Sequence, residues 1–453
     1  MKQMTFSFQV LKGVIQEAKD KLDPLDKFLF FCLFFFPFFM SSSIFLADLA
    51  CALIGVLFLY RISKSEKLKY FRKINKSFNL FIFFYLVILI SLTLSDHRDV
   101  SFLPSFFYFR YFLLSLCIYY LLKKYEILEK SFLIIIFFTI CLVLFDSIIQ
   151  ILFNYNIFGY KKIGFKEIDT IQYITSFFNE EKKLGSYLVR LLPILLSLIY
   201  LNNVKSYKYE FFILFITGIV VFHSSERTAL FLLFVVYLFY FILSDKKKYF
   251  IVLIFSIFIF LFNTENRLAN KYILFTLEQI GLNQYINGFD QKESFDERFI
   301  RYYSEEHENL SYTAYIIFKR NFIFGVGIKG FFNECNKLVK ENLNLKNSRG
   351  NKLVCSTHPH NTYLQILSEI GIFGFLIVFY LFLNLLYTNI KIIFKKNISK
   401  LNKSYFFVNL SIIINLMPLI PSGSIFNNWI SLMIFFPLGF YLFIKEKNID
   451  VSN

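Results

Sequence analysis

The chain has 453 residues, of which 56% are hydrophobic and 21% aromatic, and its formal net charge is +17. Its apolar runs have the length that a helix needs to cross roughly 30 Å of hydrocarbon, which is not expected of a soluble domain. The basic residues lie mainly in the short segments between these runs. That distribution follows the positive-inside rule and argues against a nucleic-acid partner, so membrane lipids are the expected surroundings.

The N-terminal segment places apolar and charged side chains at helical spacing over residues 5–22, which predicts a helix lying in the membrane interface. Long apolar runs follow, and they must be helices because backbone groups in lipid have to be paired internally. The predicted spans are 28–41, 43–61, 77–95, 104–122, 131–153, 185–201, 210–223, 228–244, 249–263, 361–388, 405–420 and 430–444. The boundary between the first two is marked only by three serines.

The charges of the connections test this count. Connections after every second run are rich in Lys and Arg, whereas the opposite connections carry almost no Lys, with the exception of 154–184. This alternation predicts an all-α polytopic fold of about twelve transmembrane helices with both termini in the cytoplasm. The expected organisation is a cytoplasmic N-terminus (1–27), nine spans (28–263), a large, mainly helical periplasmic loop (264–359), three spans (360–444) and a cytoplasmic tail (445–453).

The large loop carries 13 Lys and Arg against 11 Asp and Glu, so it is not an arm for binding polyanions. Its pattern predicts helices over 265–280 and 295–320, then a glycine-punctuated turn with the sequence FGVGIKGF, then a polar loop that ends at Cys355. A long loop at the end of a transmembrane scaffold is a common place for a functional site.

The end of this loop, with His358, Pro359 and His360, has the chemistry of a site. Pro359 fits the first turn of a helix that Thr357 or His358 could cap, which would place His360 in that turn. There the helix dipole would keep the imidazole of His360 neutral, and the unpaired N–H groups would attract a phosphate. Two alternatives stay open: the histidines only cap an interfacial helix, or they bind a metal, for which a third ligand at zinc-like spacing is not apparent.

His360-Asn361 is followed after nine residues by Gly371-x-x-Gly374. This spacing resembles the signature of the O-antigen ligase and polymerase superfamily, at the place where a large periplasmic loop enters a membrane helix. Further stretches are similar to that family; they are residues 177–190, 224–228, 324–327 and 422–429.

The resemblance implies a glycosyltransferase of the bacterial inner membrane whose donor is an undecaprenyl-diphosphate-linked glycan. It implies that His360 is the general base, that Arg227 and Arg190 hold the diphosphate, and that no metal or cofactor is needed. The acceptor would be lipid A–core in a ligase, which we favour, or a growing glycan in a polymerase. A protein-glycosylating member of the superfamily is an alternative, and a polysaccharide-lipid flippase or transporter is the alternative from another class, although no internal repeat supports it.

Both arginines have a simpler explanation. Arg190 could reach the interface along its own stem, and Arg227 could pair with its neighbour Glu226. Arg110, inside the fourth span, is either a third anion contact or buried with a partner. The expected supporting residues are His358, Asn361, Glu180, Arg110, Arg298 and Arg301, and Gly371 and Gly374 are expected to be structural. For Arg298 and Arg301 the choice is between facing the glycan and forming a solvated loop face.

Cys335 and Cys355 flank the polar tip of the loop. Because the expected compartment is oxidising, we hypothesise a disulfide that braces the approach to the two histidines. The remaining cysteines lie in apolar runs and are expected to behave as small hydrophobic side chains.

Overall fold

The computed structural model describes residues 20–63, 73–165, 168–204, 207–245, 304–341, 353–418 and 420–452, with the single residues Gly13, Gln16 and Phe71. Most of the predicted interfacial helix 5–22, the predicted ninth span 249–263 and the predicted loop helix 265–280 lie outside these residues. Within them the regular structure is helical apart from one two-stranded hairpin, which confirms the all-α prediction.

The helices follow the predicted spans closely. Eight of those in the described residues are long and apolar enough to cross a membrane. The elements before the large loop are α2 (Pro24–Ser42), α3 (Ile44–Ser63), α4 (Asn75–Leu94), α5 (Arg98–Phe106), α6 (Phe109–Lys124), α7 (Ile127–Phe153), α8 (Leu184–Leu201), α9 (Tyr207–His223) and α10 (Arg227–Leu243). Those after its start are α14 (Glu305–Arg320), α15 (Phe331–Glu341), α16 (Thr362–Ile393), α17 (Lys400–Ile413) and α18 (Asn428–Ser452). Helix α18 therefore runs on through most of the expected tail.

The fourth predicted span is the main departure, because one continuous helix was expected over 104–122 and the chain forms α5 and α6 instead. Side chains bind backbone carbonyls at the break. The hydroxyl of Tyr85 donates to the Phe106 carbonyl at 2.7 Å, and Arg110 Nη1 donates at 3.1 Å to the Phe107 carbonyl, which also accepts from Arg110 N at 3.2 Å. Side-chain bonds of this kind help to pair the backbone where a helix of a membrane protein is interrupted.

Ion pairs connect the helix ends that were predicted to be cytoplasmic. Arg61 and Lys124 both bind the buried Asp26, at 2.8 and 2.7 Å. Three further pairs join the other basic connections to neighbouring helix ends: Lys123–Glu446 at 2.9 Å, Lys447–Glu129 at 2.6 Å and Lys403–Asp245 at 2.9 Å. The helix ends next to the basic connections thus lie close together, as the charge alternation predicts. That they lie on the cytoplasmic face of the membrane stays a prediction.

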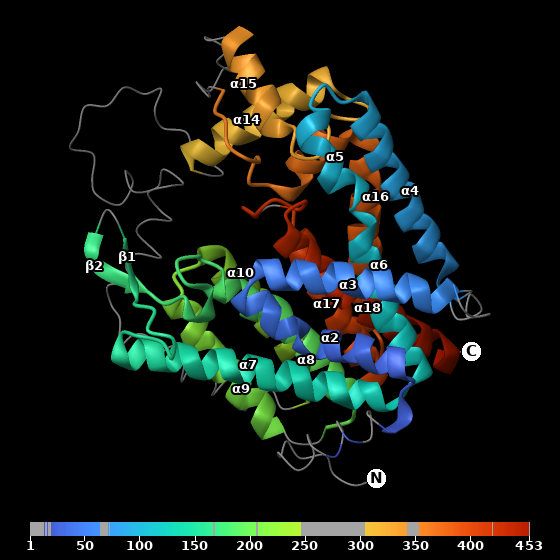
Figure 1. Cartoon of the computed structure of the whole chain (residues 1–453). Coiled ribbons are helices and arrows are strands. Elements are labelled where there is room, and N and C mark those ends of the chain that lie inside the picture. Colours follow the sequence, from blue (N-terminus) through green and yellow to red (C-terminus); the bar gives the residue numbers. More distant parts are fainter. Residues whose placement is uncertain are drawn as a thin grey trace.

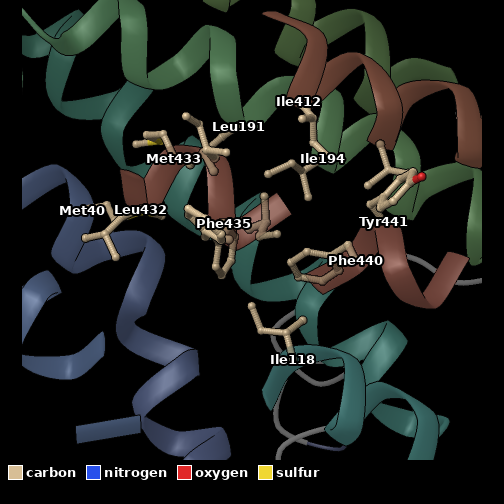
Figure 2. Packing of buried hydrophobic residues seen from close by; sticks show 14 of the residues in the cluster. Met40, Ile118, Leu191, Ile194, Ile412, Leu432, Met433, Phe435, Phe440 and Tyr441 are labelled. Atoms are coloured by element: carbon tan, nitrogen blue, oxygen red, sulfur yellow. The ribbon is translucent and has the colours of Figure 1, made fainter. Parts of the chain in front are cut away.

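The core of the bundle is formed by α8, α17 and α18, which pack closely and bury aliphatic and aromatic side chains (Figure 2). In this core Leu191 and Ile194 of α8 lie near Ile412 of α17 and Met433 of α18. Polar side chains also join these helices, and the Ser197 hydroxyl donates to the Ser404 carbonyl at 2.7 Å. Such interhelical hydrogen bonds stabilise helix contacts where the surroundings offer no water.

The described part of the large loop forms a small packed unit. Helices α14 and α15 lie together at one end of the molecule, beside the ends of α4, α5 and α16 (Figure 1). Helix α14 covers the later part of the predicted helix 295–320. Helix α15 occupies a stretch that was predicted to be a polar loop, and that prediction is wrong: Phe331, Cys335 and Leu338 recur on one face and are fully buried against α14.

Cys335 and Cys355 form a disulfide in this unit, with their Cα atoms 5.6 Å apart. Next to it, Val354 N donates to the Thr313 hydroxyl of α14 at 3.1 Å. The segment that leads to the histidines is therefore attached to both loop helices. Outside the unit, His97 Nε2 lies 2.9 Å from Glu334 Oε2, which connects the start of α5 to α15.

The connection between α7 and α8 contains the hairpin β1 (Ile163–Phe165) and β2 (Ile168–Tyr173), which are antiparallel. Two buried side chains of α7 attach this connection to the bundle. Asp146 accepts the Ser176 hydroxyl at 2.5 Å, and Gln150 Oε1 accepts the backbone N–H groups of Thr175 and Ser176 at 3.0 and 2.8 Å. These bonds place the segment before α8 against the bundle.

Candidate functional site

Three imidazole rings meet where the large loop enters α16. The ring centroids of His358 and His360 are 4.1 Å apart, and those of His307 and His360 are 5.5 Å apart. His360 has a positive φ of 53°, a conformation that the tight turn before the helix imposes on it. Sequence reasoning identified His358 and His360 but missed His307, which is contributed by the first turn of α14.

His358 has both ring nitrogens engaged. Its Nε2 lies 3.3 Å from the Ser422 carbonyl, and its Nδ1 lies 3.0 Å from the Thr357 hydroxyl. Because a carbonyl only accepts, Nε2 must carry the proton, and Nδ1 must accept from the hydroxyl. His358 therefore has no nitrogen left to act as a base, and its position is that of a structural neighbour of His360.

His307 uses one ring nitrogen in a similar way. Its Nδ1 lies 2.6 Å from the hydroxyl of Ser304, the residue that precedes α14. The contact fixes the ring at the start of the helix, with its edge against His360. Only the tertiary fold brings α14 to the end of the loop, so no local pattern could have shown this contact.

All three histidines are less basic than a free imidazole. Burial lowers the pKa of each ring, and that of His358 falls to about 4. For His307 and His358 the neighbouring His360 lowers the pKa further, whereas the Glu306 carboxylate and the Ser422 carbonyl partly oppose the effect of burial on His360. With its pKa below 6.5, the imidazole of His360 is neutral near pH 7.

The N-cap of the helix lies three to four residues later than expected. Asn361 is its N-cap, and its Oδ1 accepts the backbone N–H groups of Tyr363 and Leu364 at 3.0 and 3.1 Å. The expectation that Thr357 or His358 caps the helix and that His360 lies in its first turn is therefore wrong. Asparagine is a favourable N-cap because its short side chain can accept from both of these backbone N–H groups. Its Nδ2 also donates to the Pro418 carbonyl at 2.8 Å.

The segment between α17 and α18 lies against this helix start. Ser422 N donates to the His360 carbonyl at 2.8 Å, and its hydroxyl lies 2.9 Å from that of Thr362. Two residues further on, the Ser424 hydroxyl accepts from Gln365 Nε2 at 2.7 Å. The stretch 422–429, noted in the sequence as similar to the family, thus forms one wall of the site.

Helix α16 is kinked at Gly371, where φ is 73° and ψ is −168°. The turn 322–327 enters the kink: Val326 N donates to the Ser368 carbonyl at 3.0 Å, and Ile372 N donates to the Phe322 carbonyl at 3.0 Å. A Cβ on Gly371 would lie 2.1 Å from the Ile323 carbonyl oxygen. The glycine therefore allows the close approach of two backbones that joins the histidine segment to the loop.

Arg190 lies inside the bundle and not at its surface, so it does not reach the interface along its stem. Its side chain is 6% exposed, Nε donates to Asn415 Oδ1 at 2.7 Å, and Nη1 donates to the Ser186 carbonyl at 3.1 Å. Its guanidinium carbon is 5.8 Å from the ring centroid of Trp429. Within the described residues no carboxylate forms an ion pair with Arg190, so a buried cation lacks a direct counter-charge.

Glu226 caps the helix that carries Arg190. Its Oε1 accepts from Gly185 N at 2.6 Å and its Oε2 from Ser186 N at 3.0 Å, both at the start of α8. A side chain at Gly185 would meet Ser224 Oγ at 2.6 Å, so the glycine allows α8 and the loop before α10 to pack closely. The carboxylate of Glu226 is thereby used at a helix N-terminus, where negative charge is favourable.

Arg227 follows as the first residue of α10, and its side chain is exposed. Its charge helps to lower the pKa of His307, so the arginine lies within electrostatic reach of the histidine cluster. The pKa of Lys182, at the start of α8, is lowered by partial burial and also by Arg227. Lys182, which sequence reasoning missed, therefore belongs to the same group of cations.

The remaining expected residues are placed differently. Arg110 has a partner of the kind that one alternative expects: its Nη2 lies 2.9 Å from Asp48 Oδ1 and 2.6 Å from the Tyr111 hydroxyl. Glu180 is exposed, close enough to Tyr173 to raise its pKa. Arg298 and Arg301 lie outside the described residues. Among the described His, Cys, Asp and Glu side chains, no three come together in a way that could hold a metal ion.

Comparison with known proteins gives one match. Residues 212–379, from α9 to the part of α16 just after the kink, match the family model described as O-antigen ligase. A search of curated proteins found no match. The matched stretch includes Arg227, the loop and the whole His360–Gly374 signature. The chain is thus a multi-pass membrane protein in which residues 212–379 are similar to the O-antigen ligase family, the family that the His360–Gly374 spacing resembles.

Proposed function

We propose that the chain transfers a glycan from undecaprenyl diphosphate to an acceptor hydroxyl, at the periplasmic face of a bacterial inner membrane. The observation that carries the proposal is the imidazole of His360, which packs on His307 within electrostatic reach of Arg227 at the start of α10. His360 would bind and deprotonate the acceptor, and the cations would bind the leaving group. This pairing is what an attack on a diphosphate-linked sugar requires.

His360 is the base in this proposal because the neighbouring His358 has no accepting nitrogen left. The acceptor hydroxyl gives its proton to the imidazole as its oxygen bonds to the anomeric carbon of the donor. The bond between that carbon and the phosphate oxygen breaks, and its electron pair leaves with the lipid diphosphate. A base that is neutral near pH 7 suits this step.

Arg190 and Arg227 would neutralise the diphosphate. Glu226 occupies the N–H groups of Gly185 and Ser186 at the start of α8, so the proposal assigns phosphate binding to the arginine side chains and not to that helix end. Arg190 Nη2 has no hydrogen bond within the described residues, and Arg227 presents an exposed guanidinium near His307. A guanidinium can bind two phosphate oxygens at once.

The arginine roles can be tested with lysine substitutions, which keep the charge and lose the planar fork. In membranes supplied with undecaprenyl-diphosphate-linked glycan, Arg190→Lys and Arg227→Lys should each slow the release of undecaprenyl diphosphate by about tenfold or more. Arg320→Lys is the matched control, because Arg320 forms an exposed ion pair with Glu341 on the loop surface. Release at the wild-type rate in either test variant would remove that arginine from the proposed clamp.

The acceptor distinguishes the two types of enzyme, and we favour the ligase type, with lipid A–core as acceptor. Deletion of the gene should then leave long polymers on the lipid carrier. Single repeat units on the carrier would indicate a polymerase. Lipid-linked glycan that stays confined to the inner leaflet would indicate a flippase and would contradict glycan transfer by this chain.

A further inference from the structure

A continuous set of side-chain hydrogen bonds runs from the kink of α16 to the wall of the histidine site. Gln365 Nε2 donates to Glu369 Oε2 at 3.0 Å and to the Ser424 hydroxyl at 2.7 Å. Gln365 Oε1 accepts from Ile425 N at 3.0 Å. Gln365 and Glu369 are buried, with exposures of 1% and 0%. The mechanism proposed above uses neither residue.

The far end of this set holds the histidines. Ser422 belongs to the same segment as Ser424 and Ile425, and Ser422 N donates to the His360 carbonyl at 2.8 Å. The Ser422 carbonyl accepts from His358 at 3.3 Å. A shift of this segment along α16 would therefore move the backbone of His360 and the ring that packs on it.

The orientation of the Gln365 amide is determined by its neighbours. A backbone N–H only donates, so Ile425 must face Oε1, and the NH2 group must then find two acceptors. Glu369 supplies one of them and Ser424 supplies the other. Without an acceptor at position 369 the Gln365 amide could turn over. Its NH2 group would then face the N–H group of Ile425, and the hydrogen bond that holds segment 422–425 would be lost.

The backbone carbonyl of Glu369 accepts from Ser91 Oγ at 2.9 Å and from Gly327 N at 2.8 Å, but in the described part of the chain the Oε1 atom of its carboxyl has no hydrogen-bond partner. The backbone N–H groups of Lys329 and Phe331, in the FGVGIKGF turn, lie near the same carboxyl. A buried carboxyl is costly unless its contacts compensate, and the side-chain contact that this carboxyl makes is the hydrogen bond from Gln365.

We propose that Glu369 and Gln365 are positioning residues that set the register of segment 422–425 on α16 and thereby hold His360 in its reactive place. The proposal rests on the function assigned to His360 above. It adds that side chains of α16 next to the kink, together with segment 422–425, determine the position of the base.

The test exchanges the two groups. Gln365→Glu removes the NH2 group and sets two carboxyl groups side by side, whereas the double variant Gln365→Glu/Glu369→Gln restores a donor opposite an acceptor, and the carboxylate can still accept from Ile425 N and Ser424. Ser368→Ala is the matched control: Ser368 is equally buried at the kink, but its hydroxyl bonds only to the carbonyls of Leu364 and Gln365 in its own helix.

Release of undecaprenyl diphosphate from a purified lipid-linked glycan is measured per folded protein, as kcat and as KM for the donor. Gln365→Glu should lower kcat about tenfold to a hundredfold with little change in KM, since misplacement of a base by about 1 Å has effects of this size. The double variant should recover most of the rate, and Ser368→Ala should match the wild type. Ser424→Ala, at a partly exposed position, should give a smaller loss even if Gln365→Glu folds poorly.

His360→Ala is measured alongside. If it abolishes release while Gln365→Glu, the double variant and Ser424→Ala all behave as the wild type, the positioning role is overturned and the proposed function stands. If the double variant stays as slow as Gln365→Glu, the orientation argument is also overturned. Continued release by His360→Ala would contradict the proposed function itself.

Discussion

Replacing Gly371 by alanine tests how the kink of α16 supports the site. At φ 73° and ψ −168° the residue has a backbone conformation that is essentially restricted to glycine. The added Cβ would lie 2.1 Å from the Ile323 carbonyl oxygen and 2.6 Å from Phe324 N. Both contacts are with backbone, so no side chain can turn aside, and the turn 322–327 has to move away from α16.

The magnitude follows from these contacts. The backbone conformation costs an alanine about 1–3 kcal/mol. Displacing the turn also breaks or weakens hydrogen bonds such as Ile372 N to Phe322 O and Val326 N to Ser368 O, each worth about 1 kcal/mol. Together these effects predict a loss of about 3–5 kcal/mol in the free energy of unfolding of this region.

The assay is thermal unfolding of the purified protein in detergent, for which we expect a midpoint lowered by roughly 5–10 °C. Gly423→Ala is the matched control, because a Cβ there would meet nothing closer than Ile430 Cγ1 at 3.6 Å. The reasoning would be refuted if Gly371→Ala and Gly423→Ala unfolded at the same temperature.

Three further predictions follow from the loop and the helix start. Serine at both Cys335 and Cys355 should destabilise the loop by about 2–4 kcal/mol and speed its proteolysis, unlike serine at Cys141; labelling of both thiols in the folded, non-reduced protein would contradict the disulfide. Asn361→Ala should lower the stability by about 1 kcal/mol through loss of the cap, and further through loss of the bond to the Pro418 carbonyl, whereas Asn361→Asp should retain the cap. Equal melting points for the wild type and both variants would count against this. The pKa of His360 is lowered below 6.5, so the rate should stay constant as pH falls through 7 and decline only where the imidazole becomes protonated; a decline centred above pH 6.5 would be inconsistent with this environment.

The helices could be predicted from the sequence because their signal is local. Runs of apolar residues and the alternating charge of their connections locate most of the described spans to within a few residues. The exceptions are the break between α5 and α6, helix α17, which begins five residues and ends seven residues earlier than predicted, and helix α18, which ends eight residues later. That break is supported by Tyr85, which is distant in sequence from the carbonyl it binds. Helix α15 was missed because its apolar face is short and is buried only in the tertiary fold, by α14 and by residues such as Val326 and Val354.

Only part of the candidate site could be predicted from the sequence. The spacing of His360, Asn361 and Gly371 identified the right segment. The N-cap was predicted wrongly, because Asn361 also gains a hydrogen bond to the Pro418 carbonyl that the sequence cannot show. Arg190 was identified from its charge within an apolar run. Its partner Asn415 lies just after α17, far away in the sequence, so the sequence could not show this contact. His307 carries no pattern of its own, and only the packing of α14 brings it to His360.

The most direct test of the proposed mechanism compares two neighbouring histidines. Undecaprenyl diphosphate release is measured for His360→Gln and His358→Gln, with both proteins shown to be inserted and folded. The role proposed for His360 predicts that His360→Gln loses essentially all turnover while donor binding persists, and that His358→Gln keeps a measurable rate. Comparable turnover by the two variants, or a greater loss for His358→Gln, would contradict it.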